Sequence, residues 1–340
     1  MQARTPERII QIGMGFWPAR TLQTATNLGL FTALGKTPMT GAQIVDALGL
    51  AKRAVPDFPD ALVALNFLER ESDGPEAIYS NSEEAATFLD NASPAYVGGF
   101  LEMAHDRLYP FWADLDKGLR TGKAQNESSR GMASIFETVY SDPEGLQQFL
   151  AAMSGISTGN FMALAEKFDF SRYRTTCDVG GAEGALSIAI ARANPHLRCM
   201  TADLAPVEPI AKRKIAEAGL SDRIDTAVVD FFDDQLPRAD VITMGMILHD
   251  WDLPTKKMLI AKAYDALPDG GAFIVVEQLI DDARRENVFG LMMSLNMLIE
   301  GGEAFDYTGA DFSDWCMGAG FSSCDVIHLA GPSSAAIAYK

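Results

Sequence analysis

Cysteine and histidine are scarce in this chain of 340 residues, which contains four of each. Cys177, Cys199, Cys316 and Cys324 show no CxxC spacing, and most of them lie in apolar segments. We therefore expect reduced thiols in the core.

Long apolar and basic runs are also missing. No apolar stretch approaches the roughly 18 residues of a membrane span, and the first residues lack the apolar segment of a signal peptide. We therefore expect a cytoplasmic protein without a membrane partner. The longest basic run is KRK at 212–214, and 46 acidic against 28 basic residues give a formal charge of −18. This balance disfavours nucleic acid and favours a small molecule or another protein as partner.

Two nucleotide-binding motifs are absent. In a GxGxxG motif that starts at Gly180, Ala182 and Ala185 would occupy the second and third glycine positions. This disfavours a nicotinamide cofactor. The chain also has no GxxxxGK[ST] sequence for a nucleoside triphosphate.

The composition predicts two domains. Hydrophobic residues make up 48% of the chain, which is ample for a core, and domains usually have about 100–200 residues. Residues 1–150 have apolar residues at helical spacing, with Thr40 as a helix N-cap and Gly49 near a helix end. Helix, turn, helix and β-wing follow in the order of a winged helix. Its second helix carries Asp57 and Asp60 beside Lys52 and Arg53, so we do not expect DNA binding.

In residues 151–340, strands alternate with amphipathic helices. This order predicts an α/β fold with a mostly parallel sheet that is covered on both faces. After Phe321, the two segments SCDVIHLA and AAIAYK are joined by the short GPSS turn. We therefore expect the sheet to end in an antiparallel hairpin.

Glycines and carboxylates mark the expected ligand edge of this sheet. Gly180, Gly181 and Gly184 lie between a strand and a helix, where they allow a sharp bend and a close ligand approach. The acidic residues Asp178, Asp203 and Asp230 lie at or near the ends of successive strands, and ligands bind outside those ends in open α/β sheets. Carboxylates suit a ligand with hydroxyl groups and a positive charge rather than phosphates.

The motifs together resemble a known family. They are DVGGAEG, TADL, VVDFFD, ILHDWD, LPDGGAFIVVEQLI and MMSLNMLIEGGEAFDYTGADF, in family order. The second half resembles the Rossmann-like class I methyltransferases, which use S-adenosylmethionine (SAM). The whole chain resembles the two-domain small-molecule O-methyltransferases, such as the caffeate, phenazine and polyketide enzymes of secondary metabolism. The resemblance implies methylation of a hydroxyl on an aromatic or polyketide-like molecule.

The resemblance also implies which residues bind SAM. The three glycines of the turn match those around the methionine end, with Ala182 where a third consecutive glycine is common. Asp203 matches the acid that holds the ribose hydroxyls, and Asp230 with Phe231 matches the adenine contacts. Further residues expected at the cofactor are Asp178, Leu204 and Met244.

His249 matches the family's general base. Its unperturbed pKa of about 6.5 suits removal of a hydroxyl proton. Glu277 and Asp306 match two carboxylates that orient it, although the second position is more usually glutamate, and the shorter aspartate could lie too far away to bond directly. Asp250 is expected to make structural hydrogen bonds, and Trp251 to pack near the cofactor.

The acceptor pocket is expected on the helix NVFGLMMSLNMLIEGG and on a segment of the helical half. A stripe of methionines at helical spacing is more often core than pocket. The family nevertheless places this helix over the substrate. The candidate residues are Met103, His105, Phe111, Met293, Asn296 and Met297.

The resemblance gives residues 1–150 the roles of dimerisation and substrate capping, and residues 151–340 SAM binding and catalysis. A homodimer would bury apolar residues near the N-terminus, although they could instead pack on their own domain. They are Ile9, Ile10, Ile12, Met14, Phe16 and Trp17.

Two alternatives remain open. One is C- or N-methylation, including metal-dependent C-methylation of a 2-oxo acid with His249 and Asp250 as ligands. We expect no metal, because a third strong ligand is missing and only Glu300 or Glu303 could replace it. The other alternative is a winged-helix regulator or a SAM-binding protein without activity.

Overall fold

The computed structural model describes residues 5–131, 140 and 142–340 in two compact units, which are Met1–Pro110 and Phe111–Lys340. Each unit is described by itself. The boundary expected near residue 150 lies inside helix α11 (Pro143–Lys167), which packs on α12 (Ala185–Ala193) of the second unit. Helical spacing shows that a helix has an apolar face, but not which domain that face packs against.

The first unit has the helix order expected of a winged helix. Its sheet has the strand order β1-β3-β2. Thr40 caps α4, as predicted, and the structure adds a capping box with Gln43. Lys52 lies in a separate 3-10 turn, because Pro56 keeps the residue before it extended and α5 begins only at Asp57. The elements are α1 (Glu7–Gly13), α2 (Phe16–Asn27), α3 (Leu30–Lys36), β1 (Met39–Thr40), α4 (Gly41–Leu48), η1 (Lys52–Ala54), α5 (Asp57–Ala64), β2 (Leu68–Glu71), β3 (Ile78–Asn81), α6 (Glu83–Phe88), α7 (Gly98–Met103) and η2 (Ala104–Leu108), with α8 (Tyr109–Trp112) at the boundary.

The first two helices expose a row of large apolar side chains. Ile9 is 74% exposed, Ile12 69% and Trp17 61%, and Ile10 and Phe16 are also exposed. Monomeric proteins rarely leave such a contiguous apolar surface uncovered. The exposure is what a subunit interface on these helices would require.

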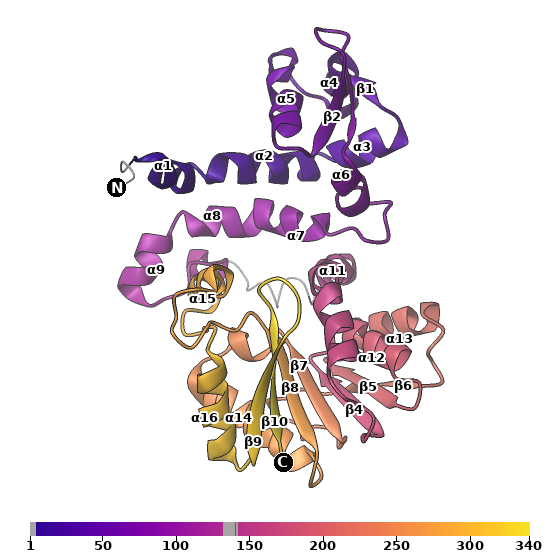
Figure 1. The fold of residues 1–340 in the computed structure, drawn as a ribbon, viewed down its shortest axis with the longest axis vertical. Coiled ribbons are helices and arrows are strands. Elements are labelled where there is room, and N and C mark those ends of the chain that lie inside the picture. The colour runs from indigo at the N-terminus through magenta and orange to yellow at the C-terminus, as the bar shows by residue number, and fades with distance from the viewer. Residues whose placement is uncertain (1–4, 132–139, 141) are drawn as a thin grey trace. The chain divides into compact units, whose positions relative to one another are not determined.

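The second unit is built on a seven-stranded sheet with the order β6-β5-β4-β7-β8-β10-β9 (Figure 1). The five strands from β6 to β8 in this order run parallel to one another. Strand β10 runs antiparallel to both of its neighbours, β8 and β9. The predicted sheet and hairpin are therefore confirmed. The strands are β4 (Thr175–Val179), β5 (Arg198–Asp203), β6 (Ile224–Val228), β7 (Val241–Gly245), β8 (Ala272–Glu277), β9 (Ser323–His328) and β10 (Ser334–Tyr339).

Alternate strand residues build a core on each face of the sheet, because successive side chains of a strand point to opposite sides. Ile242 and Phe273 pack under α14 and α16, whereas Val241 and Ile274 pack under α11 and α12. The remaining elements are α9 (Leu115–Thr121), η3 (Ser128–Arg130), α13 (Glu208–Glu217), η4 (Leu248–Asp250), α14 (Leu253–Ala266), α15 (Val288–Gly301) and α16 (Gly309–Ala319).

Three of the four cysteines, Cys177, Cys199 and Cys316, are buried, and Cys324 is half-buried. All four are free thiols, as expected. Within the described ranges, no helix combines the length and hydropathy needed to cross a membrane.

Candidate active site

The turn between β4 and α12 requires glycine at positions 180, 181 and 184. Gly180 and Gly184 have φ of +69° and +85°, a region that side chains rarely adopt. Gly181 has no room for a side chain, because a Cβ there would overlap the Thr201 hydroxyl and lie 2.9 Å from the Asp178 carboxylate. The turn therefore exposes bare backbone at the start of a helix, which suits close approach of a ligand.

Ala182 takes a left-handed conformation in the same turn, with φ of +49°. This conformation costs a residue with a Cβ roughly 1–2 kcal/mol. Its methyl group packs against a cluster that includes Leu146, Leu150 and Val207, which offsets part of that cost. The departure from the family glycine is therefore accommodated by apolar contact with α11.

Two carboxylates lie beside the glycine turn. Asp203 ends β5 and accepts hydrogen bonds from the backbone N–H groups of Ala182 (2.8 Å) and Leu204 (2.7 Å). Burial raises its pKa, although these two hydrogen bonds act in the opposite direction. Asp178 lies within β4 rather than after it, where burial raises its pKa to about 7 despite a 2.7 Å hydrogen bond from Thr243. Asp203 thus reaches the ligand edge, whereas Asp178 lies beneath the turn.

The loop after β6 carries Asp230 and Phe231. The Asp230 carboxylate accepts a hydrogen bond from the Phe232 N–H at 2.9 Å. The Trp251 ring lies edge-on to the rings of Phe231 and Phe232, with centroids 5.9 and 4.8 Å away. Trp251 therefore packs against the segment predicted to bind adenine, as expected.

Lys262 of α14 binds the backbone of this loop, a role that the sequence did not predict. Its ammonium group donates hydrogen bonds to the backbone carbonyls of Phe231 (2.7 Å), Phe232 (2.8 Å) and Asp234 (2.8 Å). Three carbonyls around one ammonium fix the path of the loop. Helical spacing places the lysine on a helix, but it does not identify the carbonyls that the ammonium binds. They belong to a segment about 30 residues earlier in the chain.

The next loop along this edge carries His249. Strand β7 ends at Gly245, and Met246 has φ of +56°, a strained value that turns the chain into η4. The Cβ position of Gly180 abuts Ile247, so this loop touches the glycine turn. Met244, at the end of β7, is fully buried beneath.

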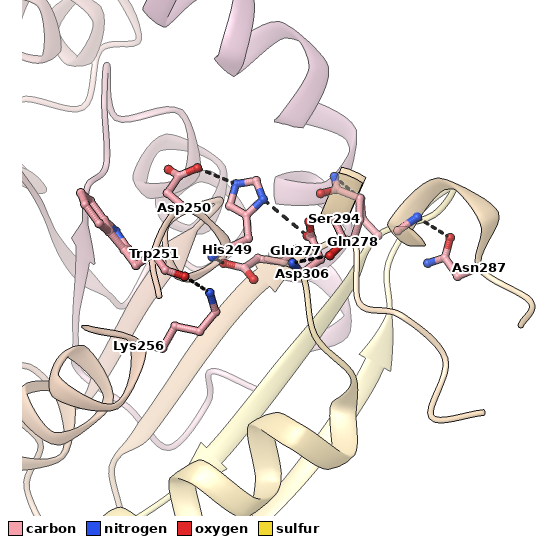
Figure 2. A network of polar contacts seen from close by, with 11 residues as sticks. His249, Asp250, Trp251, Lys256, Glu277, Gln278, Asn287, Ser294 and Asp306 are labelled. Carbon is pink, nitrogen blue, oxygen red and sulfur yellow. Dashed lines mark hydrogen bonds and ion pairs between the residues drawn. The ribbon is translucent and has the colours of Figure 1, made fainter. Parts of the chain in front are cut away.

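The His249 imidazole lies between two carboxylates (Figure 2). Its Nδ1 is 3.4 Å from Asp306 Oδ1, and its Nε2 is 3.4 Å from Asp250 Oδ1. The shorter side chain of Asp306 therefore comes within ion-pair distance of the ring, but it makes no hydrogen bond to Nδ1. His249 is only 3% exposed and Asp306 only 2%.

Glu277 contacts the main chain of this residue. Its carboxylate accepts a hydrogen bond from the His249 backbone N–H at 3.2 Å. Burial raises the pKa of Glu277, while the charge of His249 acts in the opposite direction. Glu277 thus fixes the position of η4, and Asp306 is the predicted carboxylate that faces the ring.

The charges of this cluster determine the protonation of His249. Burial alone lowers the pKa of an imidazole, but the surrounding carboxylates Asp250, Asp306 and Glu277 outweigh it and raise the pKa from 6.5 to about 10. A second cation, Lys256, is fully buried in the same cluster and was not predicted. His249 and Lys256 therefore lie among the carboxyl groups of Asp250, Asp306 and Glu277.

The predicted acceptor residues lie in both units. In the second unit, Asn296 of α15 accepts a hydrogen bond from the indole N–H of Trp112 at 2.8 Å, and Met297 and Phe111 are buried. Met293 is half-buried on the same helix.

The other two acceptor candidates, Met103 and His105, belong to the first unit. The guanidinium of Arg20 lies 3.1 Å from His105 Nε2, and Asp106 lies 2.8 Å from Nδ1. A guanidinium only donates, so Nε2 accepts and His105 carries its proton on Nδ1. Arg20 also lies over the ring of Tyr109, 4.4 Å from its centroid.

Within the described ranges, no group of three or more histidine, cysteine, aspartate or glutamate side chains has an arrangement that could hold a metal ion.

Family models match most of the chain. Residues 10–91 match the O-methyltransferase dimerisation domain, and residues 112–322 match the O-methyltransferase domain.

Three curated relatives come from Streptomyces species. The tetracenomycin polyketide synthesis 8-O-methyl transferase TcmO of Streptomyces glaucescens is 40% identical over 99% of this chain and 97% of its own length. The 3-hydroxy-5-methyl-1-naphthoate 3-O-methyltransferase of Streptomyces sahachiroi is 34% identical, over 97% of this chain and 93% of its own. The N,N-dimethyltransferase OxyT of Streptomyces rimosus is also 34% identical, over 83% of this chain and 80% of its own.

A solved structure shows the same fold around the cofactor. Human N-acetylserotonin methyltransferase in complex with SAM superposes with a TM-score of 0.91 and 26% identity, over 100% of this chain and 99% of that one. The bare backbone of the glycine turn and the Asp203 carboxylate beside it fit a ligand with ribose hydroxyls. The chain therefore belongs to the O-methyltransferase family and is a SAM-dependent methyltransferase.

Proposed function

We propose that this enzyme methylates a hydroxyl group of an aromatic or polyketide-like small molecule, with His249 as the general base. The observation that carries the proposal is the buried imidazole, which Asp306 holds at 3.4 Å on a loop that touches the glycine turn. Relatives that act in polyketide synthesis and on a hydroxynaphthoate support this acceptor class.

The cofactor residues divide by the part of SAM that each would hold. Gly180, Gly181 and Gly184 give backbone access to the methionine end. Asp203 binds the ribose hydroxyls, with Leu204 beside it, and Asp230 and Phe231 bind the adenine. Asp178 supports the turn from below, and Met244 forms the floor.

In the reaction, bound SAM supplies an electrophilic methyl group on its sulfonium. The acceptor oxygen forms a bond to the methyl carbon while the carbon–sulfur bond breaks, and His249 Nε2 takes the hydroxyl proton. The Asp306 carboxylate beside Nδ1 favours a proton on that nitrogen, which leaves the lone pair on Nε2. The acceptor hydroxyl must replace Asp250 as the partner of Nε2. Alignment of the reactants supplies most of the acceleration, and proton removal a smaller factor of about 10²–10⁴.

The protonation of His249 should couple to cofactor binding. With a pKa of about 10, the free enzyme carries the proton at neutral pH. A sulfonium nearby disfavours the imidazolium, because like charges repel. Calorimetry at pH 8 in buffers of different ionisation enthalpy should therefore show more proton release for SAM than for the uncharged thioether S-adenosylhomocysteine. Equal release for both ligands, or an equally large difference in His249→Gln, would contradict this coupling.

Activity should follow the same titration. An imidazolium cannot accept a proton, so turnover should fall as the pH drops below the pKa of His249 in the SAM complex.

Lys262→Met should weaken cofactor binding. Losing the ammonium removes three hydrogen bonds that fix the loop carrying Asp230 and Phe231. Hydrogen bonds from charged groups contribute about 1.5–3 kcal/mol, so we expect a dissociation constant for S-adenosylhomocysteine about 10-fold higher by calorimetry. Lys257→Met, at an exposed position of the same helix, is the control. Unchanged affinity in Lys262→Met would show that the loop does not need the lysine.

The acceptor atom can be tested directly. Purified enzyme is incubated with methyl-labelled SAM and a hydroxynaphthoate, its methyl ether and its amino analogue, and the products are identified by mass spectrometry and NMR. Labelled methyl ether from the hydroxyl compound alone supports the proposal. Transfer only to nitrogen or carbon would refute it.

N-methylation is the second candidate, because a relative of 34% identity is an N,N-dimethyltransferase. It would use the same cofactor residues, and the amino analogue tests it. Metal analysis of purified protein tests the metal-dependent C-methylation of a 2-oxo acid.

We also propose a homodimer formed through the first unit. The matched dimerisation domain and the exposed apolar residues of α1 and α2 support it. The residues proposed to contact the acceptor are Met103, His105, Phe111, Met293, Asn296 and Met297. Sedimentation of the purified enzyme tests the dimer.

A further inference from the structure

We propose that Lys256 is a positioning residue for methyl transfer: its buried ammonium joins the loop that carries His249 to the segment that carries Asp306. The proposal rests on the role of His249 given above. It assigns a function to a side chain seven residues after the base, in a helix whose neighbouring buried positions, Leu259 and Ile260, are apolar.

The helix start directs Lys256 toward the base. Asp252 caps α14 by accepting a hydrogen bond from the Thr255 N–H at 2.9 Å, so the helix begins directly after η4. Lys256 lies in the first turns and is 0% exposed. Its ammonium turns back and donates to the backbone carbonyl of Trp251, two residues after His249 (Figure 2).

The other face of the ammonium meets the segment after α15. It lies 3.9 Å from the ring centroid of Phe305 and 5.8 Å from that of Tyr307, which is cation–π geometry for the nearer ring. The Phe305 N–H donates to the His249 carbonyl at 3.1 Å, and the Asp306 N–H to Ser294 Oγ at 3.2 Å. Lys256 therefore contacts the two segments whose spacing sets the Asp306–imidazole distance.

The ammonium is also a charge within the cluster. Desolvation lowers the pKa of Lys256 to about 8, and the negative charges of Glu277, Asp306, Asp250 and Asp252 act in the opposite direction. His249 is the other cation, and the phenol of Tyr307 also faces Glu277. Since like charges disfavour one another, a charged Lys256 makes His249 release its proton more readily.

An apolar side chain of similar length would fill this position without the desolvation cost of an amine. Lys256→Met therefore removes the charge while conserving most of the volume. We expect it to fold and to bind S-adenosylhomocysteine within about threefold of the wild type. In the SAM complex, where the sulfonium lowers the pKa of His249 into the pH range in which Lys256 is charged, the His249 pKa should rise by about one pH unit. This is the effect expected of a unit charge lost beside the carboxylates that also surround the imidazole, in a partly screened site.

The pKa of His249 in the SAM complex can be measured without turnover, in the absence of an acceptor. The chain has four histidines, so a protein with isotopically labelled histidine gives few ring signals, and His249→Gln identifies the relevant one. In Lys256→Met, the pH profile of kcat should move toward higher pH by a similar interval. Its kcat should therefore fall about 10-fold near pH 7 and recover at higher pH. Lys256→Arg should retain the wild-type titration, and the exposed neighbour Lys257→Met is the control.

Lys256→Gln separates the effect of the charge from that of the hydrogen bond. Its amide keeps an N–H donor for the Trp251 carbonyl but carries no charge. It should shift the His249 titration as Lys256→Met does, and it serves if the methionine variant fails to fold. An unshifted His249 signal and pH profile in a folded, uncharged variant would overturn the proposal. Misfolding of both uncharged variants with recovery in Lys256→Arg would also overturn it, because Lys256 would then be required only for folding. Full turnover of His249→Gln would instead refute the base itself.

Discussion

His249→Ala is expected to lower kcat by about 10²–10⁴-fold while the dissociation constant for SAM stays within a few-fold of the wild type. The imidazole has Asp306 3.4 Å from Nδ1, and its Nε2 could accept a proton once the acceptor hydroxyl replaces Asp250. The alanine variant keeps the glycine turn and Asp203, so cofactor binding should persist.

The loss is measured by single-turnover product formation, and cofactor binding by calorimetry. His328→Ala is the matched control, because His328 is exposed on β9. The residual activity of His249→Ala should also lose the acid limb of the pH profile. Wild-type turnover in this variant would remove proton abstraction by His249 from the mechanism.

Gly181→Ala is expected to weaken cofactor binding by roughly 5- to 150-fold. Its Cβ would overlap the Thr201 hydroxyl and crowd the Asp178 carboxylate, which is fixed by the Thr243 hydrogen bond. Overpacking of this kind costs about 1–3 kcal/mol, and the turn must shift toward the ligand to relieve it. Calorimetry with S-adenosylhomocysteine measures the loss.

Gly318→Ala is the control for Gly181→Ala, because a Cβ at this exposed position in α16 has open space around it. It should bind the cofactor as the wild type does. Full affinity in Gly181→Ala would contradict the assignment of this turn to the cofactor. A lower melting temperature with unchanged affinity would show that the glycine serves folding alone.

Features with short-range signals could be predicted from the sequence. The helix N-cap at Thr40, the parallel strands and the C-terminal hairpin each depend on nearby residues and a fixed periodicity. The approach of Asp306 to His249 was implied by the family resemblance, although its distance was not. The structure gives that distance because Ser294 and the His249 carbonyl hold the segment in place.

Two of the three lysines of α14 show what the sequence could not predict. Lys256 and Lys262 occur in the run KKMLIAK, where a lysine ordinarily lies at the surface. One is buried against Phe305 and the other binds three carbonyls of a distant loop. Their partners come from other elements, so only the tertiary fold identifies them. The boundary between the two units, after Pro110, also depends on which elements pack together in the tertiary fold.

The most direct test of the account is a crystal structure of the enzyme with S-adenosylhomocysteine. We predict that the thioether sulfur faces His249 Nε2 across a gap that admits one acceptor oxygen, about 3 Å from each reacting partner. Asp306 should remain on Nδ1, and Asp203 should contact the ribose. A His249 ring that faces away from the sulfur, or a gap closed by protein side chains, would contradict the proposed mechanism.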